Sequence, residues 1–346
     1  NPRLIIFDEP TTSLTRHEVE ILFRLIGELK ADGLAIIFIS HNLEDVLHLA
    51  DQIAVLRDGE LVAYHKDRTQ FRLSTIIQQM VGRDMAQYFP EKQACFQEET
   101  LLQVQDMRVS GLLQGISFRL RRQEILGFYG LVGAGRSEMA RCLFGLDPMD
   151  AGTVSWKVQP VDSLQPHAWI ARKVAFLTED RRDEGLLMSE SIQQNIGLAA
   201  LPSFAQGLLS LVNRREVSTQ ARVQASATHT RYQDLGQQAV GTLSGGNQQK
   251  VVLGKWLLIQ PELLIMDEPT KGIDIGAKHE IYKLMQELVK GGASILLISS
   301  EIEELLGLCD RILVMKQGRI SAEFTHENFS REAILEAALH NETPAG

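Results

Sequence analysis

The sequence predicts an α/β fold in which a mainly parallel β-sheet is flanked by helices. Three observations predict it. Short apolar runs that end in acidic residues alternate with longer helical patterns, the order expected of parallel strands joined by crossover helices. A glycine-rich turn follows one such run and begins a helix. Residues 7–61 also align with residues 266–320 without a gap, at a constant offset of 259, so the same order of elements occurs twice.

The two aligned copies share a strand–helix–strand order. The elements expected in the first copy are the strand Leu4–Phe7, the helix Arg16–Ala31 and the strand Ala35–Ser40. The elements expected in the second copy are the strand Leu263–Met266, the helix Ala277–Lys290 and the strand Ser294–Ser299. The first strand of each copy ends in an acidic pair, and ligands of parallel α/β sheets gather beyond the carboxyl ends of the strands. We therefore expect both acidic pairs to lie at ligand sites.

Composition places the chain among ordinary globular proteins. Its 346 residues, 44% hydrophobic and 23% charged, leave room for two domains of the usual ~100–200 residues. No apolar run reaches the ~18 residues that a membrane span needs, and the net charge of −9 argues against a nucleic-acid partner. Cys95, Cys142 and Cys309 lie far apart, so neither a disulfide framework nor a zinc site is expected. Because the chain starts at Asn1 without an initiator methionine or a signal-peptide pattern, we expect it to be a fragment or a truncated gene model.

A phosphate-binding loop is predicted between the strand Ile125–Tyr129 and a helix over Glu138–Phe144. Its sequence, Gly130-Leu-Val-Gly-Ala-Gly-Arg-Ser137, fits the pattern G-x-x-x-x-G-K-[ST] at every defined position but one. Glycines let backbone N–H groups turn toward phosphate oxygens, the helix N-terminus adds positive potential, and the Ser137 hydroxyl suits Mg²⁺. The residues expected to bind nucleotide here are Gly130, Gly133, Ala134, Gly135, Arg136, Ser137 and Glu138.

Arg136 is the departure from this pattern, because lysine is expected at that position. A planar guanidinium does not copy the compact ammonium that reaches between the β- and γ-phosphates. We therefore expect nucleotide binding to survive here better than fast hydrolysis does. Taken alone, the loop has an alternative interpretation as a glycine-rich strand–helix turn without a ligand.

A second motif, Leu243-Ser-Gly-Gly-Asn-Gln-Gln249, begins a helix with a serine and two glycines. It closely resembles the LSGGQ signature of ATP-binding cassette (ABC) proteins, and it stands between the phosphate loop and an acid-ended strand, in the order of that family. The resemblance implies that Ser244, Gly245 and Gly246 offer N–H donors to a γ-phosphate. A capped helix start is the alternative interpretation.

The resemblance also implies roles for the acidic pairs. Asp267 would orient the Mg²⁺ shell and Glu268 would polarise the attacking water, roles that suit phosphoryl transfer. Asp8 and Glu9 match the same pattern in the first copy. The alternative for either pair is a turn-forming Asp-Glu-Pro at a strand end.

Three further positions bear on the resemblance. His41 resembles the family's switch histidine, which contacts the γ-phosphate, whereas its counterpart in the second copy is Ser300, which carries no positive charge. Glu179 lies near the place where the family has a glutamine that contacts Mg²⁺, so Glu179 is a candidate metal ligand. The aromatic residue that often stacks on adenine in this family has no equivalent in Met107-Arg-Val109.

Four stretches narrow the resemblance to one branch of the ABC family. They are Met80–Arg83, Gly130–Ser137, Glu179–Gly185 and Leu243–Lys250. Nearly the whole chain is similar to the fused double-cassette ATPases of bacterial monosaccharide importers, of the ribose, galactose, arabinose and xylose type. The resemblance implies ATP and Mg²⁺ as cofactors, two permease subunits as partners, an indirect periplasmic sugar-binding protein, and pairing of cassettes. It also implies a peripheral location on the cytoplasmic face of the bacterial inner membrane.

The same resemblance implies a domain division within a P-loop NTPase fold of the ABC type. Residues 1–82 would be the C-terminal part of a first cassette, 83–100 a connector, 101–340 a complete second cassette and 341–346 a tail. The second cassette would contain an antiparallel β portion and a helical subdomain at about 186–256. The apolar residues of this subdomain that are expected mainly in the core are Ile192, Ile196, Leu198, Ala199, Ala200 and Leu201. Because family cassettes build each site from one phosphate loop and the opposite signature, we expect negligible hydrolysis by this chain alone.

Two other functions remain open at this point. One is a soluble ABC ATPase that works on ribosomes or DNA, for which a long basic linker, a coiled coil or zinc-type cysteines would be expected. The other is a nucleotide-sensing cassette that does not hydrolyse ATP. Arg136 and Ser300 favour this second function, and Glu268 speaks against it.

Overall fold

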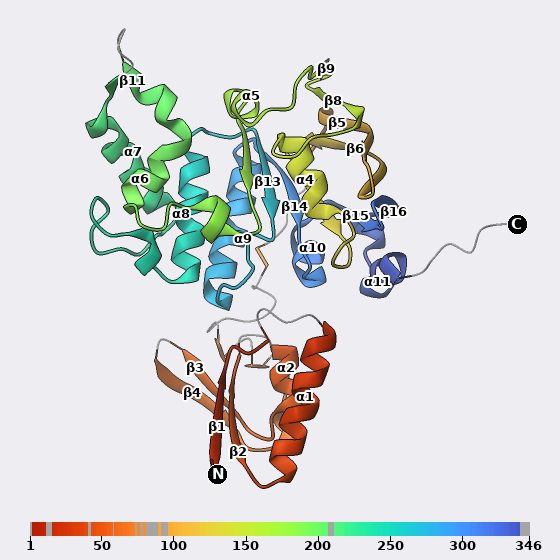
Figure 1. Ribbon diagram of the computed structural model, residues 1–346, viewed down its shortest axis with the longest axis vertical. Coiled ribbons are helices and arrows are strands. Elements are labelled where there is room, and N and C mark those ends of the chain that lie inside the picture. Colours follow the sequence, from red (N-terminus) through yellow and green to blue (C-terminus); the bar gives the residue numbers. More distant parts are fainter. Residues whose placement is uncertain are drawn as a thin grey trace, which may run out of the picture. The chain divides into compact units, whose positions relative to one another are not determined.

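The computed structural model describes residues 2–11, 16–40, 43–57, 59–72, 75–76, 79–80, 89–90, 96–206 and 211–339 (Figure 1). The chain divides into two compact units. Unit 1 comprises residues 1–89 with 272–279, and unit 2 comprises residues 90–271 with 280–346. His41, Cys95 and the expected tail 341–346 lie outside the described residues, as does most of the expected connector.

The centre of unit 2 is a six-stranded sheet with the strand order β10-β13-β14-β7-β15-β16. Its strands are β7 (Ile125–Tyr129), β10 (Val174–Leu177), β13 (Leu263–Asp267), β14 (Ser294–Ile298), β15 (Arg311–Lys316) and β16 (Arg319–Thr325). All neighbours pair in parallel except β15 and β16, as predicted for a mainly parallel sheet. The strands β7, β10, β13 and β14 are buried at every position, which explains why their sequences are continuous apolar runs.

Helices surround this sheet, and three of them gather at one side of it. The helices are α4 (Arg136–Phe144), α5 (Pro166–Ala171), α6 (Ile192–Gly197), α7 (Arg214–Ala227), α8 (Gly245–Leu257), α9 (Ile275–Lys290), α10 (Ile302–Leu308) and α11 (Arg331–Leu339). In Figure 1, α6, α7 and α8 are drawn in green and teal at the left of unit 2, and they pack on one another. They lie within the range expected for the helical subdomain.

Several short elements complete the described secondary structure, η1 in unit 1 and the others in unit 2. They are the 3₁₀ helices η1 (Arg68–Gln70), η4 (Leu198–Phe204), η5 (Val240–Thr242) and η6 (His326–Asn328), the π-helical turn η3 (Arg181–Gly185), and the paired strands β11 (Ala205–Gln206) and β12 (Leu211–Val212). Of the apolar residues expected in the subdomain core, Ile192, Ile196 and Ala200 are buried. Leu198 is 39% exposed, so the expectation holds for only part of the set.

An antiparallel sheet with the order β6-β5-β8-β9 forms the other side of unit 2, in agreement with the predicted antiparallel portion. Its strands are β5 (Gln97–Val109), β6 (Leu113–Arg122), β8 (Ala151–Trp156) and β9 (Gln159–Pro160). β5 begins at Gln97, so the last four residues of the expected connector lie in this strand. The polar start of β5 pairs antiparallel with β6, and cross-strand ion pairs accompany this pairing: Glu99 lies 2.9 Å from Arg122, and Glu98 lies 3.6 Å from Arg121.

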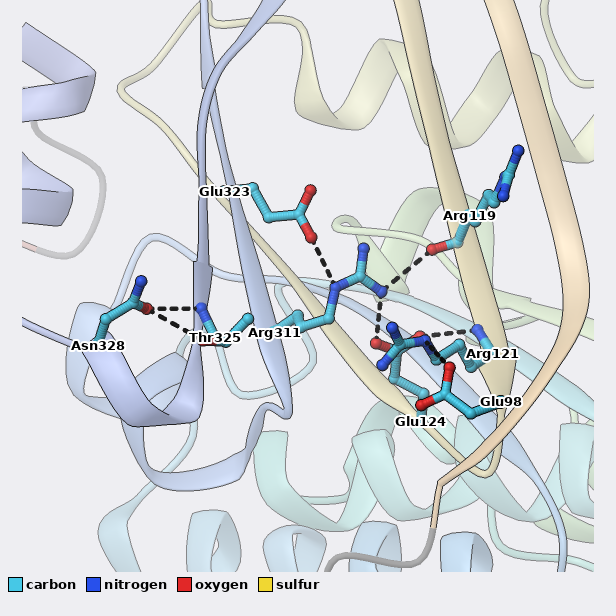
Figure 2. Close-up of polar contacts among 8 residues, drawn as sticks. All are labelled: Glu98, Arg119, Arg121, Glu124, Arg311, Glu323, Thr325 and Asn328. Carbon is cyan, nitrogen blue, oxygen red and sulfur yellow. Dashed lines mark hydrogen bonds and ion pairs between the residues drawn. The ribbon is translucent and has the colours of Figure 1, made fainter.

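A buried carboxylate joins the two sheets of unit 2 (Figure 2). Glu124, fully buried before β7, accepts hydrogen bonds from the Arg121 N–H at 2.7 Å and from Arg311 Nη1 at 2.6 Å. Arg311 also donates from Nε to Glu323 at 2.8 Å and from Nη1 to the Arg119 carbonyl at 3.3 Å. Burial raises the pKa of Glu124, while Arg121 and Arg311 oppose that rise. The ion pair therefore connects β6 with β7 and β15 where the two sheets meet.

Unit 1 is smaller, and its elements follow the same order as the elements of part of unit 2. The elements are β1 (Leu4–Asp8), α1 (Arg16–Ala31), β2 (Ala35–Ile39), α2 (Leu43–Leu49), β3 (Ile53–Arg57) and β4 (Glu60–His65). Adding 259 to the bounds of β1, α1, β2 and α2 gives those of β13, α9, β14 and α10. β1 pairs in parallel with β2, and β3 pairs antiparallel with β4, as their counterparts do.

Burial separates these strands from their counterparts. Exposed and half-buried residues alternate along β1 and β2, whereas every residue of β13 and β14 is buried. The exposed apolar side chains on the two strands are Leu4, Ile6, Ile37 and Ile39. One face of this two-stranded sheet is therefore apolar and open to solvent, which is unusual for a parallel pair.

Candidate functional site

The predicted phosphate loop lies between β7 and α4, as its sequence context indicates. Gly133 and Gly135 have φ angles of 80° and 98°, in the left-handed region that glycine adopts without strain. Gly130 is required for a different reason: a Cβ there would lie 2.5 Å from the Met315 carbonyl oxygen. The loop is also held by the turn after β15, where the Gly318 N–H donates to the Ala134 carbonyl at 3.0 Å.

The helix that follows the loop presents free donors at its start. Gly135 is the N-cap of α4 and supplies no side chain to cap the first N–H groups. Such an N-terminus attracts anions, because its N–H groups and the helix dipole both favour negative charge. Arg136 is buried, and Ser137 and Glu138 are half-buried, so the three predicted residues begin α4 at this anion-binding end.

Arg136 connects the phosphate loop to the acidic pair after β13. Its Nη2 lies 3.5 Å from Glu268 Oε1, and its Nη1 donates to the Ser299 carbonyl at 2.9 Å. The second oxygen of Glu268 accepts a hydrogen bond from Ser300 Oγ at 3.0 Å. The structure thus brings three predicted positions together, Arg136, Glu268 and Ser300. The sequence reasoning missed the Ser299 carbonyl, because a backbone acceptor leaves no signal in residue type.

Asp267 ends β13 beside Ser137, with only 2% of its surface exposed. Burial raises its pKa to about 7, and a hydrogen bond from the Ser137 side chain opposes that rise. Asp267 Oδ1 is buried and has no hydrogen-bond partner among the described residues. A buried oxygen left unpaired beside a hydroxyl and a carboxylate is the kind of donor set that Mg²⁺ accepts.

The surroundings of Glu268 shift the pKa of its carboxylate and strain its backbone. Burial raises its pKa, while the Arg136 charge and the hydrogen bonds from Ser300 oppose the rise. Its φ of 47° is strained for a residue with a side chain, and the Glu268 N–H donates to the Ile298 carbonyl at 2.9 Å. Backbone strain of this kind persists only where surrounding structure holds it, and it often accompanies function.

Glu179 lies after β10, and its carboxylate is held by a cation rather than left open. Lys271 Nζ lies 2.7 Å from Glu179 Oε1, a pairing that the sequence did not predict. Arg181 Nη1 donates to the Lys271 carbonyl at 2.8 Å, so the segment after β10 is tied to the segment after the acidic pair. In the described part of the chain, no group of three or more His, Cys, Asp and Glu residues is arranged to hold a metal. A metal here would therefore need oxygens from Ser137 and from a phosphate.

The predicted signature begins α8. Ser244 is the N-cap, and its hydroxyl accepts from Asn247 Nδ2 at 3.0 Å and from no backbone N–H. The N–H groups at the start of α8 therefore stay available to an anion. Within the described residues, no hydrogen bond or ion pair joins Ser244, Gly245 or Gly246 to the phosphate loop.

The corresponding acids of unit 1 lie after β1. Glu9 has a φ of 48°, and its N–H donates to the Ile39 carbonyl at 2.9 Å, which matches the backbone of Glu268. Asp8 is exposed, unlike Asp267. His41 falls outside the described residues.

Comparison with known proteins gives matches over most of the chain. A sequence model described as "ABC transporter" matches residues 113–271. The "putative ribose/galactose/methyl galactoside import ATP-binding protein 1" of Rhizobium etli is 42% identical over 97% of this chain and 63% of its own length. The "ribose import ATP-binding protein RbsA" of Bacillus cereus is 38% identical over 99% of this chain and 68% of its own length. The chain spans about two thirds of the length of the curated relatives it matches.

Solved structures match the fold. A nucleotide-free ATP-binding cassette from an ABC transporter aligns with a TM-score of 0.60 and 21% identity, over 70% of this chain and all of that one. A dimeric bacterial ABC transporter cassette aligns with a TM-score of 0.57 and 20% identity, over 66% of this chain and all of that one. At these identities the likeness concerns the fold alone.

Proposed function

The chain belongs to the family of ABC transporter ATP-binding proteins, and from that premise we propose that unit 2 binds ATP with Mg²⁺ at Gly130–Ser137. The observation that carries the proposal is the meeting of the phosphate loop with the acidic pair through Arg136 and Glu268. The backbone donors of the loop and of the start of α4 would take the phosphates. Ser137 and Asp267 would hold Mg²⁺, which supplies charge neutralisation to phosphate oxygens when it is bound. The unpaired Asp267 Oδ1 supports this assignment.

For the chemistry, we propose an ATPase in which Glu268 orients and polarises the attacking water. The carboxylate lies beside the loop, and its raised pKa favours acceptance of a proton. Arg136 and Ser300 reduce the rate of this site. The planar guanidinium of Arg136 does not copy the compact ammonium of a lysine, and Ser300 offers a hydroxyl where a histidine would offer positive charge. Ser244, Gly245 and Gly246 would act on a nucleotide held by another cassette, because no hydrogen bond or ion pair among the described residues joins them to this loop.

We further propose that unit 1 is the matching part of a second cassette, with Asp8, Glu9 and His41 as its site residues. The shared bounds at an offset of 259 and the matching backbone of Glu9 and Glu268 support this proposal. The apolar face of β1 and β2 also supports it, because a complete cassette sheet covers the equivalent strands of unit 2.

The names of the relatives support sugar import as the process that is energised. The proteins from Rhizobium etli and Bacillus cereus are named as import ATP-binding proteins for ribose or related sugars. We propose that this protein works with two permease subunits, receives sugar indirectly from a periplasmic binding protein, and lies at the cytoplasmic face of the inner membrane. No described helix is both long enough and apolar enough to cross a membrane.

One observation favours a second function, a cassette that senses nucleotide without hydrolysing it. The Glu268 carboxylate is held by Arg136 on one side and by Ser300 on the other, so a water molecule would compete with two existing partners. Sensor and motor differ in whether bound ATP turns over.

Calorimetric titration of the purified chain with ATP, with and without Mg²⁺, tests the nucleotide site. We expect Mg²⁺-dependent binding that Asp267→Asn weakens, with ATP turnover near background. An absence of ATP binding at any Mg²⁺ concentration would refute the nucleotide site. ATP turnover that is well above background and is abolished by Glu268→Gln would instead refute the proposal that this site hydrolyses ATP slowly. Copurification with a multi-spanning permease tests the transport assignment.

A further inference from the structure

Arg136 occupies a position from which it serves two anions in turn. Its side chain is 10% exposed, and its partners in the structure are the Ser299 carbonyl and the Glu268 carboxylate. Both partners belong to segments that follow central strands, β14 and β13, whereas Arg136 itself begins α4. The residue therefore bridges three elements at the carboxyl edge of the sheet.

The two contacts differ in quality. The bond from Nη1 to the Ser299 carbonyl, at 2.9 Å, has the ordinary length of an N–H···O hydrogen bond. The distance from Nη2 to Glu268 Oε1, at 3.5 Å, exceeds the ~2.7–2.9 Å of a charge-assisted hydrogen bond. The carbonyl thus anchors the guanidinium, and the carboxylate holds it by charge at longer range. The weaker contact is the one that a stronger anion displaces.

A nucleotide supplies such an anion. The phosphates would lie against the same loop that carries Arg136, and a guanidinium pairs readily with phosphate oxygens. A single guanidinium does not satisfy the phosphates and Glu268 equally well at the same time. Resting on the nucleotide site proposed above, we propose that Arg136 is a positioning residue that releases Glu268 when nucleotide binds.

The consequence is a site in which nucleotide and Glu268 compete for one cation. In the structure, Arg136 and Ser300 each hold one carboxylate oxygen of Glu268. When nucleotide binds, Arg136 turns to the phosphates, and Glu268 keeps its contacts with Ser300. Because the Arg136–Glu268 pair must break when nucleotide binds, the nucleotide affinity is lowered by the free energy of that pair.

A double-mutant cycle on ATP affinity tests this competition. Calorimetry on the whole chain at one fixed, saturating Mg²⁺ concentration would compare Glu268→Gln in the wild-type background and in the Arg136→Met background. We expect Glu268→Gln to tighten ATP binding about tenfold when Arg136 is present, equivalent to about 1.4 kcal/mol. With Arg136→Met, we expect a gain of only about twofold to threefold, from reduced repulsion of phosphate by the carboxylate.

Two further variants keep the cycle interpretable. Glu179→Gln removes a nearby negative charge that pairs with Lys271, so it should produce the same small gain in both backgrounds. Arg136→Lys keeps a cation if Arg136→Met does not fold, and it should retain part of the coupling. Tryptophan fluorescence melting checks folding, because all three tryptophans lie in unit 2.

The outcomes separate this inference from the function on which it rests. An equal gain from Glu268→Gln in both backgrounds, with ATP binding intact, would overturn the competition and leave the nucleotide site standing. An absence of ATP binding in every variant would overturn both. A gain confined to the Arg136 background would support the competition.

Discussion

Replacing Asp267 with asparagine should stabilise unit 2 in the absence of nucleotide, and the gain should grow with pH. Burial holds the pKa of Asp267 at about 7 in the folded protein, against 3.8 for an unperturbed aspartate. Between these values the folded state binds a proton that the unfolded state has released, so stability falls as the pH rises from about 4 to 7. Asparagine keeps the shape and acceptor of the side chain and never ionises.

The size of the effect follows from the shift. A difference of about 3 pKa units at ~1.4 kcal/mol each gives an upper limit of about 4 kcal/mol at pH 8. At pH 5, the pH is only a little more than one unit above the unperturbed pKa of 3.8, so Asp267→Asn should stabilise unit 2 by less than about 2 kcal/mol. For a unit of this size, 4 kcal/mol corresponds to a rise in melting temperature on the order of 10 °C.

Tryptophan fluorescence is the suitable assay, because Trp156, Trp169 and Trp256 all lie in unit 2. The melting temperatures of the wild-type and Asp267→Asn chains would be compared at pH 5 and pH 8, without nucleotide or divalent cations. A larger difference at pH 8 is expected. A variant that is destabilised, or that differs from wild type equally at the two pH values, would show that Asp267 does not resist ionisation in the folded state.

Two other predictions concern stability. Arg311→Met should destabilise unit 2 by about 3–5 kcal/mol, because it leaves the fully buried Glu124 charge without its partner, and adding Glu124→Gln should recover part of the loss; urea unfolding of both variants measures this. Gly318→Ala should cost more than about 3 kcal/mol, because a Cβ there would lie 1.9 Å from the Leu112 carbonyl oxygen at a φ of 75°. Gly292→Ala is the matched control, with a φ of 104° but no atom within 4 Å, and should cost only about 1–2 kcal/mol; equal losses would refute the steric reasoning.

The sequence was most informative where one local pattern determines one element. The strand Ile125–Tyr129 and the helix Arg16–Ala31 have the predicted bounds, because each is a single uninterrupted pattern. The start of β5 was missed because its residues are polar, and it forms a strand by pairing with β6, where Glu98 and Glu99 also pair with arginines. Cross-strand charge pairing carries no local signal.

The site shows the same division. Residue type and order were sufficient to select Arg136, Asp267 and Glu268 as its members. They were not sufficient to pair Arg136 with Glu268 or Glu179 with Lys271, because those contacts depend on the strand order of the sheet. The two ion pairs, Arg136–Glu268 and Lys271–Glu179, therefore form only when the chain folds.

Unit 1 adds a physical lesson about burial. The apolar runs of β1 and β13 are similar enough to predict buried strands in both, yet Leu4 and Ile6 are exposed while all of β13 is buried. Apolar side chains favour burial, but whether they are buried depends on the segments that pack against them. In β2, Ile37 and Ile39 extend the same open face, so the apolar pattern is continuous across both strands. A surface of this kind is costly in water, and the matching strands of unit 2 are covered on both faces. The open apolar face of β1 and β2 is therefore the strongest physical support for the proposal that unit 1 is part of a second cassette.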